Sequence, residues 1–189
     1  MYRKQYQYAN QYLMKYNNIL RQMYNSMVSQ SVTCSITKDF ICTMVPHHLA
    51  AIHMCENLLN YTEFTPLVSI ANNIIAEQTQ GIENMKKLLE NACNFTNENC
   101  DVCCYMDEYY KIADKMVYKM RSSPKNINIC LNFINEMIPH HEGAIHMCEN
   151  VLKYEIDPEL KIIAQNIIST QGQGITEMGN VRKNILSNS

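Results

Sequence analysis

The sequence predicts an all-α fold, a helical bundle built from two tandem three-helix repeats related by a pseudo-two-fold axis. Two observations support this prediction. Segments of the first half of the chain recur in the second half, and apolar residues recur with the 3.6-residue period of a helix rather than the alternation of a strand. The 189 residues also include only five glycines and five prolines, which is typical of long helices joined by short connections.

The repeat is clearest around two pairs of adjacent histidines. The segment MVPHHLAAIHMCEN at 44–57 matches MIPHHEGAIHMCEN at 137–150, at an offset of 93 residues. The same offset aligns methionines before these segments and a glutamine-rich stretch after them. We therefore expect a first repeat at 1–94 and a second at 95–189, because the Asn- and Thr-rich stretch 94–99 suits a linker.

Each repeat is expected to contain three helices. In the first repeat an apolar stripe predicts a helix at about 2–29, and a second helix runs from about Thr37 to 60. A third helix ends near residue 90, and Thr65 and Pro66 supply its N-cap and its first-turn proline. The second repeat follows the same plan, with helices that begin at Asp101, Asn126 and Asp157.

The second helix of each repeat places donor atoms for a metal on one face. In the first repeat these residues are Met44, His47, His48 and Cys55, with Met54 on the flank. In the second repeat they are Met137, His140, His141 and Cys148, with Met147 on the flank. Imidazole, thioether and thiol donors suit copper, especially Cu(I), whereas magnesium and calcium prefer oxygen ligands. The pattern predicts one copper site in each repeat, and a chain without any metal is the alternative.

The third helix of each repeat carries a glutamine in an otherwise apolar row. Gln78 and Gln171 occupy these positions, with Met85 and Met178 in the same rows. A buried amide needs hydrogen-bond partners, and a histidine ring nitrogen across the bundle is a suitable one. We expect these four residues to support the histidines rather than bind metal directly.

A structural role explains the same residues without a metal. Buried imidazoles can bond carbonyl groups or one another, and methionines at helical spacing usually fill the core. Pro46 and Pro139 predict a kink in the two His-His helices, either to set the rings or only to accommodate packing. His53 and His146 lie on the outer faces of these helices, so we expect them at the surface or at a subunit contact.

Nine cysteines are a high and odd number. Because the sequence shows no export signal, we expect reduced thiols rather than a disulfide framework. Three of them form a C-x-x-C-C run, Cys100, Cys103 and Cys104, which the first repeat lacks. A single C-x-x-C is half of a typical zinc site. The run is therefore either an accessory thiol or metal site, or a set of inert cysteines at the start of a helix.

Charge and hydropathy exclude other classes of partner. A net charge of −2 without a basic patch does not provide the positive surface that binds nucleic acid or an anionic membrane. No apolar stretch approaches the roughly 20 residues that span a bilayer, and the segment MYRKQYQYANQYL lacks the apolar core of a secretory signal. We expect a cytoplasmic protein whose partners are a metal ion and, as an open alternative, a second copy of the chain in a homodimer.

Both repeats resemble the signature of the domain of unknown function 305 family, a ferritin-like helical group. The resemblance rests on MVPHHLAAIHM and MIPHHEGAIHMCENVL, each followed by a second motif, IIAEQTQGIENM or IISTQGQGITEM. It implies a ferritin-like bundle and, for some members, copper binding or copper tolerance through Met and His. Gly81 and Gly174 depart from the family pattern, which has an acidic residue at this place.

Three functions are compatible with these features. The first is a non-catalytic protein that binds or buffers copper, and the second is a structural or interaction module with a buried His-His network and no metal. The third is a di-iron carboxylate enzyme, which needs Glu-x-x-His pairs on facing helices. No Glu-x-x-His occurs in the chain, so we expect that the protein is not an enzyme.

Overall fold

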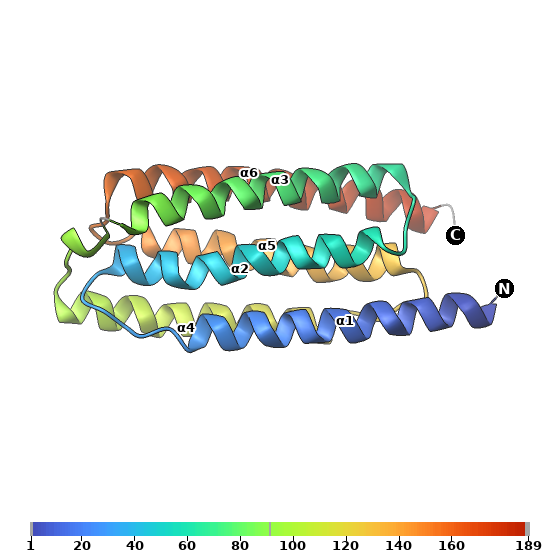
Figure 1. The fold of residues 1–189 in the computed structure, drawn as a ribbon, viewed down its shortest axis with the longest axis horizontal. Helices are drawn as coiled ribbons and strands as arrows, with labels where there is room; N and C mark the ends of the chain where they lie inside the picture. The colour runs from blue at the N-terminus through green and yellow to red at the C-terminus, as the bar shows by residue number, and fades with distance from the viewer. Residues whose placement is uncertain (1, 91, 188–189) are drawn as a thin grey trace.

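The computed structural model describes residues 2–90 and 92–187, which form a bundle of six long helices and no strand (Figure 1). The all-α prediction is therefore confirmed. The elements are α1 (Tyr2–Val28), α2 (Ile36–Leu59), α3 (Thr65–Leu89), a short 3₁₀ helix η1 (Ala92–Asn94), α4 (Asn99–Ser122), α5 (Ile129–Val151) and α6 (Pro158–Ser187). None of the helices among these residues is long and apolar enough to cross a membrane.

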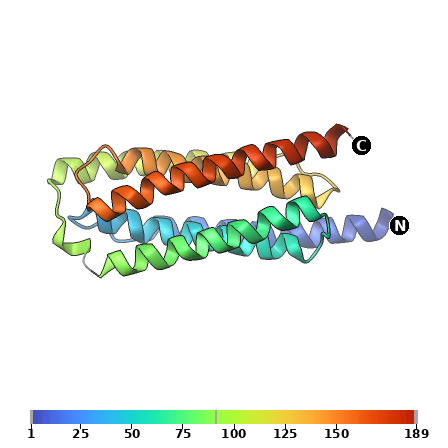
Figure 2. The ribbon, with the colours of Figure 1, turned by 90° about the horizontal axis from the view of Figure 1, so that it is seen from above.

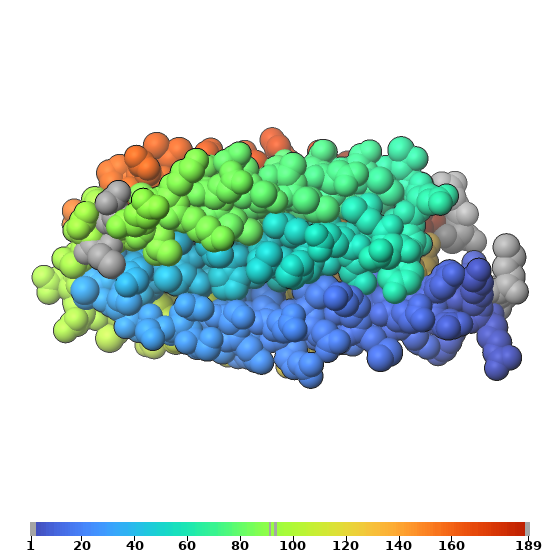
Figure 3. Space-filling view, in the orientation of Figure 1, coloured from blue at the N-terminus to red at the C-terminus, as the bar shows by residue number. Residues whose placement is uncertain are grey.

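The helices stack in three layers of two, and equivalent helices of the two repeats share a layer (Figures 1 and 2). The middle layer is α2 and α5, which lies between α1 with α4 and α3 with α6. The two helices of each layer run antiparallel, as expected for repeats related by a pseudo-two-fold axis. Figure 3 shows α1, α2 and α3 of the first repeat packed side by side on one face. One hydrophobic core runs through both repeats, whereas the boundary at residue 94 stays a prediction.

α1 begins at Tyr2 as predicted, whereas the starts or N-caps of the other helices differ from the predicted ones by one to three residues. Ser35, not Thr37, is the N-cap of α2, and its hydroxyl accepts a hydrogen bond from the Lys38 amide. The Thr37 hydroxyl instead accepts a hydrogen bond from the Asp157 amide in the other repeat, at 3.1 Å. The predicted N-cap at Thr65 is wrong, because Phe64 holds that position and forms no side-chain cap. The other starts are displaced too: α4 begins at Asn99 after Glu98, and α5 at Ile129 after the N-cap Asn128.

Equivalent hydrogen bonds hold the outer and middle layers together in both repeats. The Asn57 side chain donates to the Tyr12 carbonyl at 3.1 Å, and the Asn150 side chain donates to the Tyr105 carbonyl at 3.0 Å. Both asparagines are buried. A donor that satisfies a backbone carbonyl inside the bundle fixes the register of the two helices, so the repeat in the sequence is also a repeat in packing.

One buried carboxylate breaks this symmetry. Glu136 on α5 is fully buried, whereas the equivalent residue of the first repeat is Thr43. Glu136 accepts hydrogen bonds from the Tyr12 hydroxyl at 2.7 Å and from the Lys125 ammonium at 3.0 Å. Burial raises the pKa of Glu136 to about 7, although Lys125 and Tyr12 act in the opposite direction. The network joins α1 of the first repeat to α5 of the second.

We predict that Tyr12→Phe lowers the free energy of unfolding by about 1 to 3 kcal/mol, because it leaves an oxygen of buried Glu136 without its donor. The matched control is Tyr105→Phe at the equivalent position, where the hydroxyl faces Thr43 rather than a buried carboxylate. The control should lose less stability than Tyr12→Phe. Chemical denaturation measures both variants, and equal losses in the two would contradict the assignment.

Candidate functional site

The four paired histidines lie in the interior, at the middle of the central layer. The exposed fractions of His47 and His140 are 0%, and those of His48 and His141 are 2%. The His47 and His140 rings stack across the α2–α5 interface, with centroids 3.7 Å apart and an interplanar angle of 27°. The sequence predicted one cluster in each repeat, but the structure joins the inner histidines of both repeats in one place.

One hydrogen bond of the stacked pair defines the tautomer of His140. His140 Nε2 lies 3.2 Å from the His47 carbonyl oxygen, and since that oxygen can only accept, His140 Nε2 carries the proton. His47 Nε2 lies 3.3 Å from the Met116 sulfur. The Nδ1 atoms of all four histidines are buried and have no hydrogen-bond partner. Buried nitrogens without a partner in the protein call for an explanation, such as a bound water or an ion.

The histidines are uncharged near neutral pH. Burial lowers the pKa of His48 to about 4 and the pKa of His141 to about 3. The pKa values of His47 and His140 are also well below the usual range, first because of burial and then because neighbouring histidines disfavour a second positive charge. Neutral imidazole is the form that binds a metal, so little free energy is needed to remove protons first.

These shifts predict how the stability of the metal-free protein depends on pH. Each buried histidine takes up a proton in the unfolded chain below its usual pKa of 6.5, but not in the folded chain until about pH 4 for His48. Stability is therefore complete above pH 6.5 and falls between pH 6.5 and 4, by about 1.4 kcal/mol per pH unit for each histidine. Glu136 acts with the opposite sign, but it is one group against four.

Denaturant titrations across that range, with a chelator present, measure this dependence. A free energy of unfolding that stays constant as the pH falls would contradict neutral, buried histidines.

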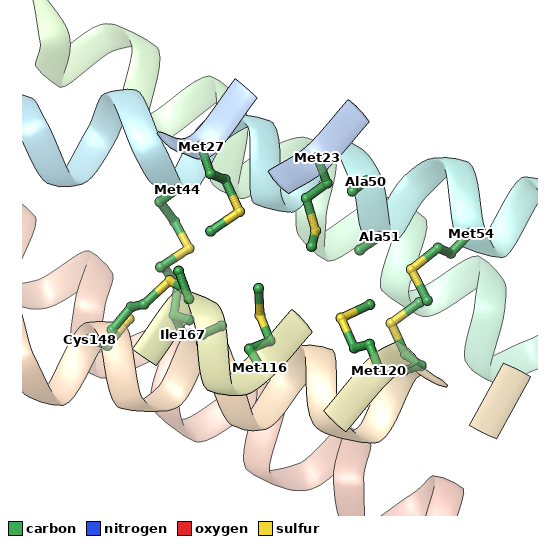
Figure 4. Packing of buried hydrophobic residues seen from close by; sticks show 14 of the residues in the cluster. Met23, Met27, Met44, Ala50, Ala51, Met54, Met116, Met120, Cys148 and Ile167 are labelled. Atoms are coloured by element: carbon green, nitrogen blue, oxygen red, sulfur yellow. The ribbon is translucent and has the colours of Figure 1, made fainter. Parts of the chain in front are cut away.

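Met116 is held against His47 by a glycine on α5. A Cβ atom on Gly143 would overlap the sulfur of Met116, and it would lie 3.0 Å from Met116 Cβ. The equivalent residue in the first repeat is Ala50, and the methionine equivalent to Met116 is Met23. Figure 4 shows Met23 and Met116 inside the bundle, on α1 and α4. The difference between glycine and alanine is thus a local reason for the unequal contacts of the two inner histidines.

We predict that Gly143→Ala displaces Met116 from His47 and lowers the free energy of unfolding by about 1 to 3 kcal/mol through overpacking. Gly172→Ala on α6 is the matched control, because a Cβ there meets no atom within 4 Å. The control should gain about 1 kcal/mol from the higher helix propensity of alanine. Thermal or denaturant unfolding measures both, and a Gly143→Ala variant as stable as the control would contradict the close contact.

The remaining sulfur atoms of the predicted sites are buried but spread along the bundle. Met44 and Met54 are ten residues apart on α2, so the helix rise separates them by about 15 Å. One ion therefore cannot contact both. In Figure 4 Met44 points from α2 toward the region of Cys148 on α5, while Met54 lies toward Met120. The same burial holds for the other predicted sulfur ligands, which are Cys55, Met137 and Met147.

Burial also raises the pKa of the Cys55 and Cys148 thiols well above the usual range. These cysteines stay protonated in the metal-free chain, which makes them poorer ligands than a thiolate. The sulfur in contact with the inner histidines is thus the thioether of Met116, 3.3 Å from His47 Nε2.

The expected hydrogen bonds from the third helices to the histidines are absent among the described residues. Gln78 and Gln171 are buried, but Gln78 Oε1 and both polar side-chain atoms of Gln171 have no partner. The residue beside His48 is Gly81, where a Cβ would lie 3.1 Å from His48 Nε2, and Gly174 stands beside His141 in the same way. The histidine partners predicted for these two glutamines are therefore wrong. Met85 and Met178 are buried, and their support of the histidines stays a prediction.

A crevice between α3 and α6 leads to this glycine. Its cavity of about 250 Å³ is lined by His48, Glu77, Gln78, Gly81 and Gln171, among others. Burial raises the pKa of Glu77, and Glu177 on α6 adds to this effect. The outer histidine of the first repeat therefore lies next to a cavity of mixed polar and apolar lining, whereas His47 lies against the opposite histidine and the Met116 sulfur.

Among residues 2–90 and 92–187, no three His, Cys, Asp or Glu side chains converge as they would around a metal ion. Sequence reasoning gave too little weight to Met116, although its alignment with Met23 marks it as a repeated core methionine. It also missed Gly143, whose only signal is the alanine in the other repeat. The sequence also did not predict the asymmetric Glu136 network, because its only sign there is an acidic residue in an otherwise apolar row.

Comparison with known proteins identifies the class to which this bundle belongs. Residues 7–89 and 127–185 match the family described as Domain of unknown function (DUF305). The chain belongs to this family, and the two matched segments fall in the two repeats. No curated protein and no solved structure was found to match. The likeness to ferritin-like bundles stays a prediction.

Proposed function

We propose that the chain binds a soft metal ion, Cu(I), at the central histidines and buffers it rather than catalysing a reaction. The observation that carries this proposal is the set of four buried, neutral imidazoles whose Nδ1 atoms have no partner. Leaving one polar atom unpaired in a core costs about 1 to 3 kcal/mol. A ligand that uses these nitrogens gives a reason for keeping all four inside the bundle.

The donor atoms favour Cu(I) over zinc and iron. A structural zinc site needs four ligands from Cys, His and carboxylates, and a di-iron site needs carboxylates on facing helices. The centre offers imidazole nitrogen with the thioether of Met116, which lies 3.3 Å from His47 Nε2. Thioether and imidazole donors suit Cu(I), which accepts few ligands. His47 would hold the ion through Nε2 together with the Met116 thioether, and His140 through Nδ1, because His140 Nε2 donates to the His47 carbonyl. His48 and His141 would lie beside them.

A shared centre fits the packing better than one site in each repeat. His47 comes from α2 and His140 from α5, and their rings are in contact across the interface. An ion bound there would tie the repeats together, and its affinity would depend on both. Because the centre is closed to solvent, a substrate cannot reach it, which supports storage or transfer of an ion rather than catalysis. Reduced thiols and Cu(I) both suit the cytoplasm.

The test is a titration of the reduced protein with Cu(I) in competition with a chelator. We expect the double variant His47→Asn/His140→Asn to lose the central ion, and Met116→Leu, which keeps the packing volume, to bind it roughly tenfold more weakly. The matched control is His53→Ala/His146→Ala, which changes two histidines of the same helices that lie outside the core. The control should bind like the wild type. Unchanged binding in all variants, with circular dichroism showing that they are folded, would reject the proposal.

A structural His network is the second candidate, and one observation favours it. The two inner rings already stack at 3.7 Å, and one of them donates to a backbone carbonyl, as a metal-free network would. The two candidates differ in the melting temperature. An ion that binds only the folded chain raises the melting temperature in proportion to the logarithm of its concentration. A structural network leaves it unchanged when Cu(I) is added.

A further inference from the structure

The exposed cysteines are concentrated at one end of the bundle. Cys100, Cys103 and Cys104 are exposed on α4, and Cys34 is exposed in the connection between α1 and α2. Figure 1 places this connection and the start of α4 at the same end. The Asn97 amide donates to the Cys34 carbonyl at 2.8 Å, so Cys34 lies beside the segment that leads into α4. The two cysteines of the central helices that face the core, in contrast, are buried.

Helix geometry gathers three of these thiols on one patch. Cys100 lies in the first turn of α4, and Cys103 and Cys104 follow at positions i+3 and i+4. Side chains at these spacings are neighbours on a helix surface, with Cβ atoms about 5 to 6 Å apart. Val102 and Tyr105, between and after them, are buried on the other side of α4. The thiols therefore point away from the core, and packing makes no use of them.

The other repeat shows what the fold itself requires at these positions. Gln7, Asn10 and Gln11 are the equivalent residues on α1, and all three are exposed. The same helix thus forms with amides in place of thiols. Three exposed thiols on one helix face are not needed for stability, and exposed thiols are open to oxidation. A role outside the fold explains their presence in one repeat only.

We propose that Cys100, Cys103 and Cys104, whose sulfur atoms do not converge in the structure, turn toward one another to form a second, surface site for a soft thiophilic ion of the Cu(I) type, bound through two or three thiolates. Each thiol releases its proton to solvent as its sulfur bonds to the ion, so no oxidant or reductant is needed. Thiolate ligands select soft ions, and a cysteine side chain needs to turn about only one torsion to bring its sulfur to a neighbour. The site is independent of the central histidines and stands whether or not they bind metal.

The first repeat supplies the matched variant. In Cys100→Gln/Cys103→Asn/Cys104→Gln each cysteine takes the residue of the equivalent position on α1, so the helix and its melting temperature should be preserved. We expect this variant to bind one Cu(I) fewer than the wild type and to lose the ultraviolet thiolate-to-metal charge-transfer band of that ion. Cys34→Ser, which removes the fourth exposed thiol at the same end, should bind like the wild type. A triple variant that keeps the wild-type stoichiometry and band would overturn the proposal.

The reverse experiment transfers the site. Gln7→Cys/Asn10→Cys/Gln11→Cys places the same three thiols on α1, and we expect one additional Cu(I) with a thiolate band. A transplanted variant without the extra ion would show that three thiols on a helix face are not sufficient. The double His47→Asn/His140→Asn variant should keep the thiolate band. The experiment therefore distinguishes loss of binding at the central site from loss of binding at the surface site.

Discussion

The contact between α2 and α5 at His47 and His140 is the interaction on which the rest of the structure depends. It lies at the centre of the middle layer, and both outer layers pack on the helices that make it. Four imidazoles inside an apolar core are costly to charge, which keeps them neutral and moves their pKa values down. The fold therefore places uncharged nitrogen donors in its interior, with His48 at the edge of the crevice between α3 and α6. The proposed binding of a soft ion rests on this environment.

Two symmetric repeats do not give a symmetric centre. Small substitutions decide which partner each inner histidine finds: Gly143 lets Met116 approach His47, and Ala50 stands at the equivalent place in the first repeat. Glu136 adds a buried carboxylate on one side only, bonded to Tyr12 and Lys125. Because the side chains of a dense core fit together in only a few arrangements, adding one methyl or one carboxyl group changes which residues are in contact. Divergence after the duplication thus made the two halves of the centre unequal.

Sulfur is distributed in two chemically different environments. The interior holds thioethers and the protonated thiols of Cys55 and Cys148, while one end of the bundle carries exposed thiols. Thioethers bind without losing a proton, so they can act in a closed core, whereas thiols bind best where the proton can leave to solvent. The proposed surface site and the proposed central site would therefore use sulfur atoms of different proton chemistry.

The sequence by itself determined the helices, the duplication and the burial of the His-His pairs, because these follow from periodicity within single helices and from a repeat visible in the letters. The family match agrees with this part. Only the tertiary structure decided which donors meet. Helix periodicity put Met44, His47 and Cys55 on one face, but it says nothing of distance along the axis or of the antiparallel partner. The pairing of His47 with His140 and Met116, and the missing partner of Gln78, depend on how six helices pack around one another.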